Sequence, residues 1–182
     1  MTLPISLLPL SLDYHIGALQ AVYQATPSYW RLYNLASSPP DQAERDLRAA
    51  AETPGRYLLG IVQRIVADDP GAGAELIGIV DFRLHWPASD VAYVGLLLVA
   101  EPYQRQGIAS QAWQLLEPWL STTAQMQKVR LGVEQFNPHA LKFFEHLGFR
   151  LTGEADRIKV GDKLVRLLYM EKAWQASTLG PK

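Results

Sequence analysis

The chain has 182 residues, of which 48% are hydrophobic and 19% charged, as is typical of one soluble globular domain. Its net charge of -1 predicts no global attraction to nucleic acid or to an anionic membrane. The absence of cysteine excludes disulfides and thiolate chemistry, and four histidines without metal-ligand spacing indicate no metal site. The N-terminal segment has no basic n-region and contains Pro4 and Pro9, so a cytoplasmic protein is expected.

The N-terminal third predicts one strand followed by helices. Alternating apolar residues over 5–10 indicate the strand, and Asp13 is the expected N-cap of a helix over 14–25. The segment over 37–52 combines a proline-rich entry with a charged, alanine-rich run that predicts another helix. Between these helices lies a short segment with three aromatic residues, Tyr29, Trp30 and Tyr33.

The middle of the chain predicts a hairpin and a buried strand. The runs 56–66 and 76–86 are strand-like, and the polar, glycine-rich segment between them favours a turn. The run 91–99 ends in four consecutive apolar residues, which is typical of a strand covered on both faces.

A tight strand-to-helix turn follows, with the sequence "EPYQRQGIA". Apolar residues at helical spacing predict a helix that begins near Gly107 and bends or ends at Pro118. The first amides of a helix have no intrahelical partner, and small side chains at Gly107 and Ala109 let an anion approach them. Arg105 adds a positive charge, so the turn could hold a pyrophosphate. On the glycine alone, an ordinary strand-to-helix turn is the preferred interpretation.

The C-terminal third predicts one further helix between strands. Residues 129–134 alternate as a strand does, and Asn137 and Pro138 are the expected N-cap and first residue of a helix. Gly148 is expected to close that helix. Residues 149–174 resemble two strands, with a hairpin turn at residues 161–162.

Two motifs, taken together, resemble those of the GNAT acyltransferases, the GCN5-related N-acetyltransferase superfamily. The family's phosphate loop, Gln/Arg-x-x-Gly-x-Gly/Ala, matches Gln104 to Ala109. The family's Asn-x-x-Ala motif, followed by an aromatic residue four positions before Gly-Phe, matches Asn137, Ala140, Phe144 and Gly148-Phe149. The resemblance covers roughly residues 58–172.

This resemblance implies an α/β fold with a mixed, mostly antiparallel central sheet of six to seven strands, helices on both faces and splayed central strands. It implies one domain over 1–182, with substrate-side helices over 1–55 and an acyl-CoA-binding core over 56–174. It also implies acetyl-CoA as cosubstrate, with the thioester between the splayed strands. The implied coenzyme A contacts are Leu97, Leu98 and Val99 for the pantetheine arm, Gln104, Arg105, Gln106, Gly107, Ile108, Ala109 and Ser110 for the pyrophosphate, and Asn137 and Phe144.

The sequence departs from the family pattern at its proton-transfer positions. The tyrosine that usually protonates the thiolate is replaced by Phe144, and Tyr93 stands where many relatives carry a glutamate. The candidate catalytic residues are therefore Tyr93, as a hydroxyl near the thioester, and Glu134 or Asp81, as the base. Each has a structural alternative: an aromatic residue within a sheet, a solvated carboxylate and a salt-bridged aspartate, respectively.

The expected function is transfer of an acetyl group from acetyl-CoA to a primary amine of a small molecule or a peptide. Phe144 supports the alternative of a non-catalytic acyl-CoA-binding module. Tyr29, Trp30 and Tyr33 are candidates for the wall of the acceptor pocket, or alternatively pack in the core. No nucleic acid, membrane or metal is expected as a partner, and a homodimer is left open. The sequence does not identify the acceptor.

Overall fold

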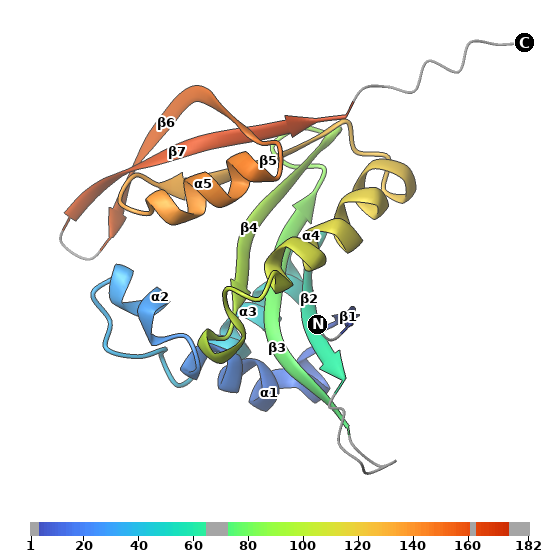
Figure 1. Ribbon diagram of the computed structural model, residues 1–182, viewed down its shortest axis with the longest axis vertical. Helices are drawn as coiled ribbons and strands as arrows, with labels where there is room; N and C mark the ends of the chain where they lie inside the picture. Colours follow the sequence, from blue (N-terminus) through green and yellow to red (C-terminus); the bar gives the residue numbers. More distant parts are fainter. Residues whose placement is uncertain (1–3, 65–72, 161–162, 175–182) are drawn as a thin grey trace, which may run out of the picture. The chain divides into compact units, whose positions relative to one another are not determined.

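The computed structural model describes residues 4–64, 73–160 and 163–174 (Figure 1). Its strands are β1 Ile5–Pro9, β2 Arg56–Arg64, β3 Ala74–Leu84, β4 Val91–Val99, β5 Lys128–Glu134, β6 Arg150–Val160 and β7 Lys163–Ala173. Its α-helices are α1 Leu12–Gln24, α2 Pro27–Leu32, α3 Gln42–Glu52, α4 Ile108–Pro118 and α5 Pro138–His146. A 3₁₀ turn, Glu101–Tyr103, precedes α4, and a π-helical turn, Trp119–Thr123, follows it.

The strands form one seven-stranded sheet in the order β1-β2-β3-β4-β5-β7-β6. β2 pairs antiparallel with β1 and β3, and β7 pairs antiparallel with β5 and β6. β4 and β5 are parallel: Val91–Val94 pair with Lys128–Leu131, and β4 then continues to Val99. The predicted mixed, mostly antiparallel sheet with helices is confirmed.

The chain divides into two compact units, which we describe separately. Unit 1 comprises Met1–Arg83 and Gly95–Glu117, and unit 2 comprises Leu84–Val94 and Pro118–Lys182. β4 contributes its first residues to unit 2 and its last residues to unit 1. The single-domain organisation expected from the sequence stays a prediction.

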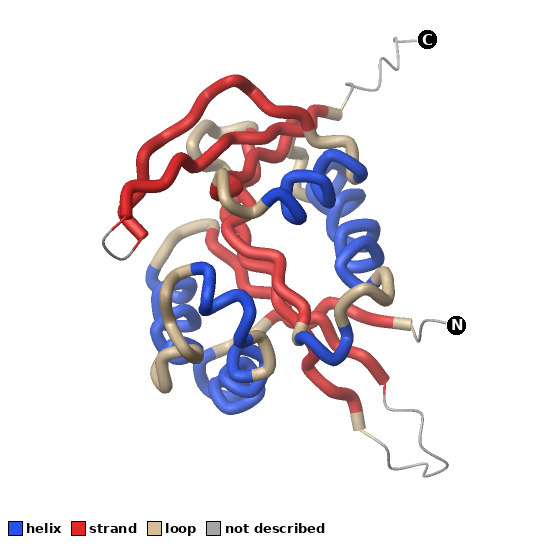
Figure 2. The backbone as a smooth tube through the Cα atoms, turned by 60° about the vertical axis from the view of Figure 1, so that its left-hand side comes forward, coloured by secondary structure: helices blue, strands red, loops and turns tan. Residues whose placement is uncertain are grey.

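In unit 1, helices cover both faces of the strands. α1, α2 and α3 lie on one side and α4 on the other (Figures 1 and 2). Burying a large apolar side chain contributes about 1.5–3 kcal/mol, so the apolar cluster under α1–α3 holds these helices to the sheet. The buried members of this cluster are Leu19, Tyr23, Trp30, Ala43, Leu47, Leu58, Ile79 and Leu98.

The backbones of β3 and β4 approach closely at Gly78. A Cβ atom on Gly78 would lie 2.5 Å from the carbonyl oxygen of Leu98 and 3.3 Å from the Cα of Val99. Just beyond this contact, the Ala100 N–H donates to the Ile77 carbonyl at 2.8 Å. Only glycine lets the two strands come this close.

β4 also contains one extra residue relative to β3. At one end Ala100 bonds to Ile77, and at the other a Cβ on Gly95 would contact Asp81. Between these two points β4 advances by five residues and β3 by only four. Leu98 and Gly95 are three residues apart and would alternate to opposite faces of a regular strand. Leu98 belongs to the cluster under α1–α3, and Asp81 shares that face because it pairs in register with Leu58. A β-bulge between Gly95 and Ala100 accounts for the shift.

In unit 2, α5 covers one face of the strands (Figure 1). β5 alternates strictly, and its buried residues are Val129, Leu131 and Val133. The Phe144 ring of α5 packs edge-to-face on the Phe149 ring, with 5.4 Å between centroids. The opposite face of β5 carries charged side chains.

The predicted helices and strands are confirmed, with one correction at a cap, and the short helix α2 was not predicted from the sequence. The first helix begins at Leu12 with Ser11 as N-cap, so the prediction of Asp13 as N-cap is wrong. Asp13 lies instead in the first turn, where its charge suits the helix dipole. Pro118 ends the α-helical part of α4, as predicted. The turns predicted over 68–75 and at 161–162 lie largely or wholly outside the described residues.

Within the described part of the chain, every helix is too short or too polar to cross a bilayer.

Gly78→Ala should lower the free energy of unfolding by about 1–3 kcal/mol, because its methyl group would overlap the backbone of β4. Gly17→Ala is the matched control. A Cβ at Gly17, inside α1, would meet no heavy atom within 4 Å, and we expect a gain of about 0.4–1 kcal/mol there. Denaturant unfolding of both variants measures the difference, and equal stabilities would contradict the close approach.

Candidate functional site

The backbone between β4 and α4 forms a concave turn in unit 1. Arg105 has φ 60° and Gly107 has φ 78°, so two left-handed residues flank Gln106. Alternating backbone conformations of this kind turn successive N–H groups toward one point, which creates an anion-binding nest. A Cβ on Gly107 would meet no heavy atom within 4 Å, so the backbone there is open to an approaching ligand.

The N-terminus of α4 adds further amides to this nest. The Gln111 N–H donates to the Gly107 carbonyl at 3.0 Å, which begins the helical bonding. The amides of Ile108, Ala109 and Ser110 precede that bond and belong to the turn that an α-helix leaves without intrahelical acceptors. Ile108 is 1% exposed and anchors the helix start in the core. We call residues 104–110 the anion cradle.

Side chains of the same segment hold the cradle to the end of β4. The Gln104 side-chain amide donates to the Val99 carbonyl at 2.7 Å, and the Gln106 amide donates to the Pro102 carbonyl at 3.0 Å. The Tyr103 hydroxyl donates to the Glu75 carboxylate at 2.7 Å. Gln104 is thus a positioning residue, since its side chain bonds to protein backbone.

Glu101 connects this segment to the helices at the N-terminus. Its N–H donates to the Ala25 carbonyl at 2.9 Å, and its carboxylate accepts from the Ser28 N–H, in the first turn of α2, at 2.7 Å. Hydrogen bonding from Ser28 lowers the pKa of Glu101. The sequence analysis missed this contact, because 73 residues separate its partners.

The predicted pantetheine residues lie on the last part of β4. Leu98 and Val99 are buried and Leu97 is half-buried, so their backbone rather than their side chains would be offered to a ligand. Gly95, just before them, is exposed.

Asp81 forms a salt bridge beside Gly95. Its two carboxylate oxygens accept from Arg56 at 3.0 and 2.6 Å, and both side chains are largely buried. Next to them, the Tyr23 hydroxyl donates to Asp46 at 2.7 Å. Burial raises the pKa of Tyr23 far above its ordinary value. Asp81 therefore has the salt-bridged arrangement that was its structural alternative, and its role as a base stays a prediction.

The aromatic segment after α1 is part of the core. Trp30 is 7% exposed, and its indole N–H donates to the Tyr23 carbonyl at 2.8 Å. The Tyr29 ring packs on Trp30 and on Tyr33, with centroids 5.0 and 5.2 Å apart. A role of these residues in acceptor binding stays a prediction.

In unit 2, the second motif builds the ends of α5. The Asn137 side chain accepts from the Ala140 N–H at 3.2 Å, as an N-cap does, which confirms the predicted cap. Gly148, with φ 92°, closes the helix: its N–H donates to Glu145, and the Phe149 N–H donates to Phe144. The tyrosine position of the family is held by the buried Phe144, which offers no proton.

A row of aromatic and charged side chains lies on the strands of unit 2, on the face opposite the buried residues of β5. Tyr93 packs edge-to-face on Trp86, with centroids 4.7 Å apart, and burial raises the pKa of its hydroxyl. Tyr93 pairs in register with Arg130, whose guanidinium lies 4.2 Å from the centre of the Tyr169 ring. Sequence reasoning missed Arg130 and Tyr169, because their significance depends on strand neighbours.

Several carboxylates lie around this row. Glu171 accepts from Arg130 at 2.9 Å, and Glu154 also accepts from Arg130. The Tyr169 hydroxyl donates to Asp156 at 2.7 Å; burial and this bond raise the pKa of Tyr169 to about 12. Glu134 lies close enough for its charge to contribute to the raised pKa of Tyr93. An acid and a base candidate therefore share one region of unit 2.

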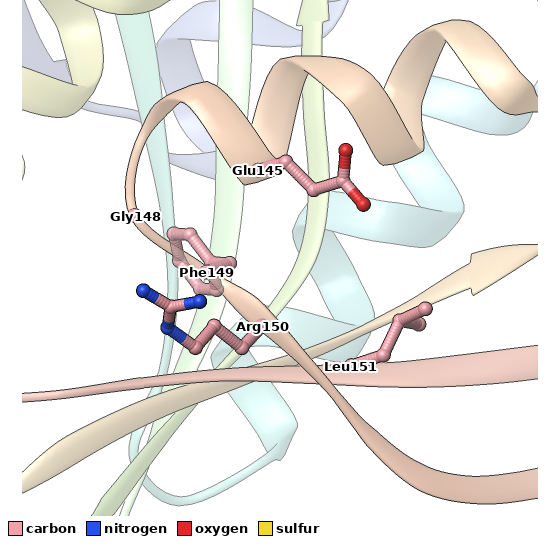
Figure 3. Close-up of a pocket in the computed structure, with 5 residues that line it drawn as sticks. All are labelled: Glu145, Gly148, Phe149, Arg150 and Leu151. Carbon is pink, nitrogen blue, oxygen red and sulfur yellow. The ribbon is translucent and has the colours of Figure 1, made fainter.

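A pocket of about 320 Å³ lies at the C-terminal end of α5 (Figure 3). Glu145, Gly148, Phe149, Arg150 and Leu151 line it. Figure 3 shows the charged side chains of Glu145 and Arg150 pointing apart, so they do not converge on a common ligand. Among the described residues, no group of three or more metal-ligating side chains is present.

Comparison with known proteins agrees with the motifs. A sequence model described as the acetyltransferase (GNAT) family matches residues 19–149. A search of curated proteins found no match.

Several solved structures share the fold. An acetyltransferase from Thermus thermophilus is 24% identical, with a TM-score of 0.72, 94% of this chain covered and 98% of that one. A probable GNAT-family acetyltransferase from Chromobacterium violaceum is 17% identical, with a TM-score of 0.75 and coverage of 95% and 84%. Spermidine N-acetyltransferase from Vibrio cholerae, solved with CoA and spermine, is 17% identical, with a TM-score of 0.66 and coverage of 93% and 95%. At these identities the likeness shows the fold alone.

Asn137→Ala should lower the free energy of unfolding by about 0.5–2 kcal/mol, because the Ala140 amide loses its acceptor. Asn137→Asp is the matched control, since an aspartate at this position can accept the same bond. Denaturant unfolding compares the two. If Asn137→Asp lost as much stability as Asn137→Ala, the cap would not be the stabilising contact.

Proposed function

Because the chain belongs to the acetyltransferase (GNAT) family, we propose that it transfers the acetyl group of acetyl-CoA directly to a primary amine. The observation that carries the proposal is the anion cradle: two left-handed residues, Arg105 and Gly107, at the start of α4. Its open backbone at Gly107 fits a diphosphate, which backbone amides and a helix N-terminus bind well.

The chain's own residues would hold the cosubstrate along β4 and the cradle. Amides of residues 104–110 would bind the pyrophosphate, with the Arg105 side chain adding a charge-assisted contact. Backbone of Leu97, Leu98 and Val99 would bind the pantetheine arm. The cosubstrate supplies an acetyl group already activated as a thioester, so positioning of the amine can contribute much of the acceleration.

The proton donor is assigned to unit 2. Tyr93 carries a hydroxyl that is protonated at neutral pH, as a proton donor requires, and burial raises its pKa further, which makes it a weaker acid. Glu134 and Asp81 both stay candidates for the base, and the two carboxylate oxygens of Asp81 accept from Arg56. Phe144 packs on Phe149, and its contact with coenzyme A is proposed from the family motif alone.

A second candidate is a non-catalytic module that binds acyl-CoA, and the buried Phe144 favours it. Release of thiol from acetyl-CoA, measured against a panel of primary amines, separates the two. The panel includes spermine and spermidine, because the Vibrio cholerae structure contains spermine, together with simple alkylamines and peptides. Amine-dependent thiol release supports the enzyme, and its absence with retained binding supports the module. The cytoplasmic location and a homodimer stay predictions.

Gly107→Asp should abolish coenzyme A binding, because it places a carboxylate where the pyrophosphate would lie. Gly107→Asn is the matched control: it has the same shape, both residues tolerate positive φ better than other side chains, and only the charge differs. Calorimetric titration with coenzyme A should show a much larger loss for Gly107→Asp. Equal affinities in two folded variants would overturn the cradle assignment.

Tyr93→Phe should lower turnover by up to about 10²-fold if its hydroxyl donates the proton. Phe144→Tyr restores a hydroxyl in the family's usual position, so the loss from Tyr93→Phe should be smaller in that background. Steady-state kinetics on the four proteins of this cycle, with the best amine of the panel, provide the comparison. Unchanged turnover on Tyr93→Phe in both backgrounds would make Tyr93 a packing residue of the sheet.

A further inference from the structure

Gly95 is the exposed residue of an otherwise covered central strand. β4 is the fourth of seven strands, and its other residues are buried or half-buried. A glycine within a strand lowers its stability, because it fixes a flexible residue and packs no side chain. Its presence at this position therefore calls for a reason.

Neither backbone conformation nor packing supplies that reason. Gly107 needs its positive φ, and Gly78 needs its lack of a Cβ. Gly95 has no positive φ, and a Cβ there would lie 3.9–4.0 Å from its nearest neighbours, which is ordinary van der Waals contact. An alanine would fit. A methyl group at Gly95 would touch Asp81 at ordinary distances, and the residue itself is exposed, so the position can take a group from outside the strand.

This position lies on the side of the strands that faces α1–α3. The atoms near an added Cβ all belong to Asp81, which shares the face of Leu58 and the buried cluster. The carboxylate oxygen Oδ2 of Asp81 is among them, at 4.0 Å. The space beside Gly95 is therefore bordered by a carboxylate.

The local charge favours a cation at that border. Arg56 is shared between Asp81, which it bonds directly, and Asp46, whose charge also acts on it. Asp46 accepts from the neutral Tyr23 hydroxyl. Two carboxylates beside one guanidinium leave a net charge of about -1, and partial burial strengthens its attraction for an ammonium group.

The position of Gly95 along β4 relates this space to the cradle. From Gly95 to Val99 the strand spans about 13 Å, at about 3.3 Å per residue. Beyond Val99 the chain enters the segment that Gln104 holds to the Val99 carbonyl. An extended pantetheine arm, which contains two amide bonds, is comparable in length to such a strand segment, so a thioester held along it would end near Gly95.

We propose that Gly95 determines acceptor specificity: its missing side chain leaves room for a cationic primary amine, which the Asp81–Arg56 pair borders and orients. This inference rests on the proposed function and specifies its acceptor side. The predicted acceptor has an unbranched carbon next to its ammonium group, since branching there would need the same space. Asp81 acts as a positioning residue, not as the base.

The test uses Gly95→Ala and Gly95→Val, with Gly17→Ala as control. Probes are n-butylamine, the branched sec-butylamine and spermine. One added methyl or methylene group in a binding pocket changes kcat/KM by about 10- to 200-fold, so Gly95→Ala should lose about tenfold with n-butylamine and Gly95→Val more. Coenzyme A affinity and melting temperature should be retained in Gly95→Ala, because an alanine fits the fold.

A second variant tests the charge. Asp81→Asn keeps the shape of the side chain and removes its charge. It should lower kcat/KM for n-butylamine, which is an ammonium ion at neutral pH, and leave it unchanged for hydroxylamine, which is mostly neutral. A merely structural loss would affect both nucleophiles alike and would overturn the role of Asp81.

The outcomes distinguish a failure of this inference from a failure of the proposed acetyl transfer. If the parent protein acetylates an amine and Gly95→Ala and Gly95→Val do so equally well, the inference is overturned and the function stands. If the parent transfers to no amine, calorimetry of n-butylamine and spermine with the coenzyme A-loaded protein decides. Binding that Gly95→Val removes supports the acceptor space. An absence of binding in the parent overturns the inference together with the function.

Discussion

The backbones of β3 and β4 meet at Gly78 so closely that no side chain fits between them, and the candidate site depends on this contact. This contact determines where β4 ends along β3, because the Ala100 amide bonds to the Ile77 carbonyl directly after it. The chain leaves the sheet at that point, and the Gln104 side chain holds the following turn to Val99. The position of the cradle amides is thus determined by their attachment to the sheet.

Three glycines of this region serve three physical purposes. Gly78 admits a neighbouring strand, Gly107 adopts a left-handed conformation, and Gly95 is the exposed residue of a covered strand. The bulge between Gly95 and Ala100 connects these purposes, because it changes which side chains face α1–α3 over the last part of β4. A strand without the extra residue would place Gly95 and Leu98 on opposite faces.

The polar groups of the protein are organised around two arginines. Arg56 joins Asp81 within unit 1, and Arg130 joins Glu154 and Glu171 within unit 2 while lying on the Tyr169 ring. A charge that is partly removed from water remains stable only when it is paired, so these partners constrain each other's position. Tyr93, which we propose as the proton donor, pairs in register with Arg130.

The sequence alone determined the local features of this protein: the alternation of the strands, the caps of α5 and the glycine-bearing turn before α4. These depend on residues within a few positions of each other, so their patterns are visible in the chain. The Ser11 cap was missed for a local reason, since Ser11 and Asp13 are both good caps. Only the tertiary structure decided that Asp81 pairs with Arg56, that Glu101 bonds to Ser28 and that Gly95 lies beside Asp81. These contacts join residues far apart in sequence, and strand register, including one extra residue in β4, selects which of them meet.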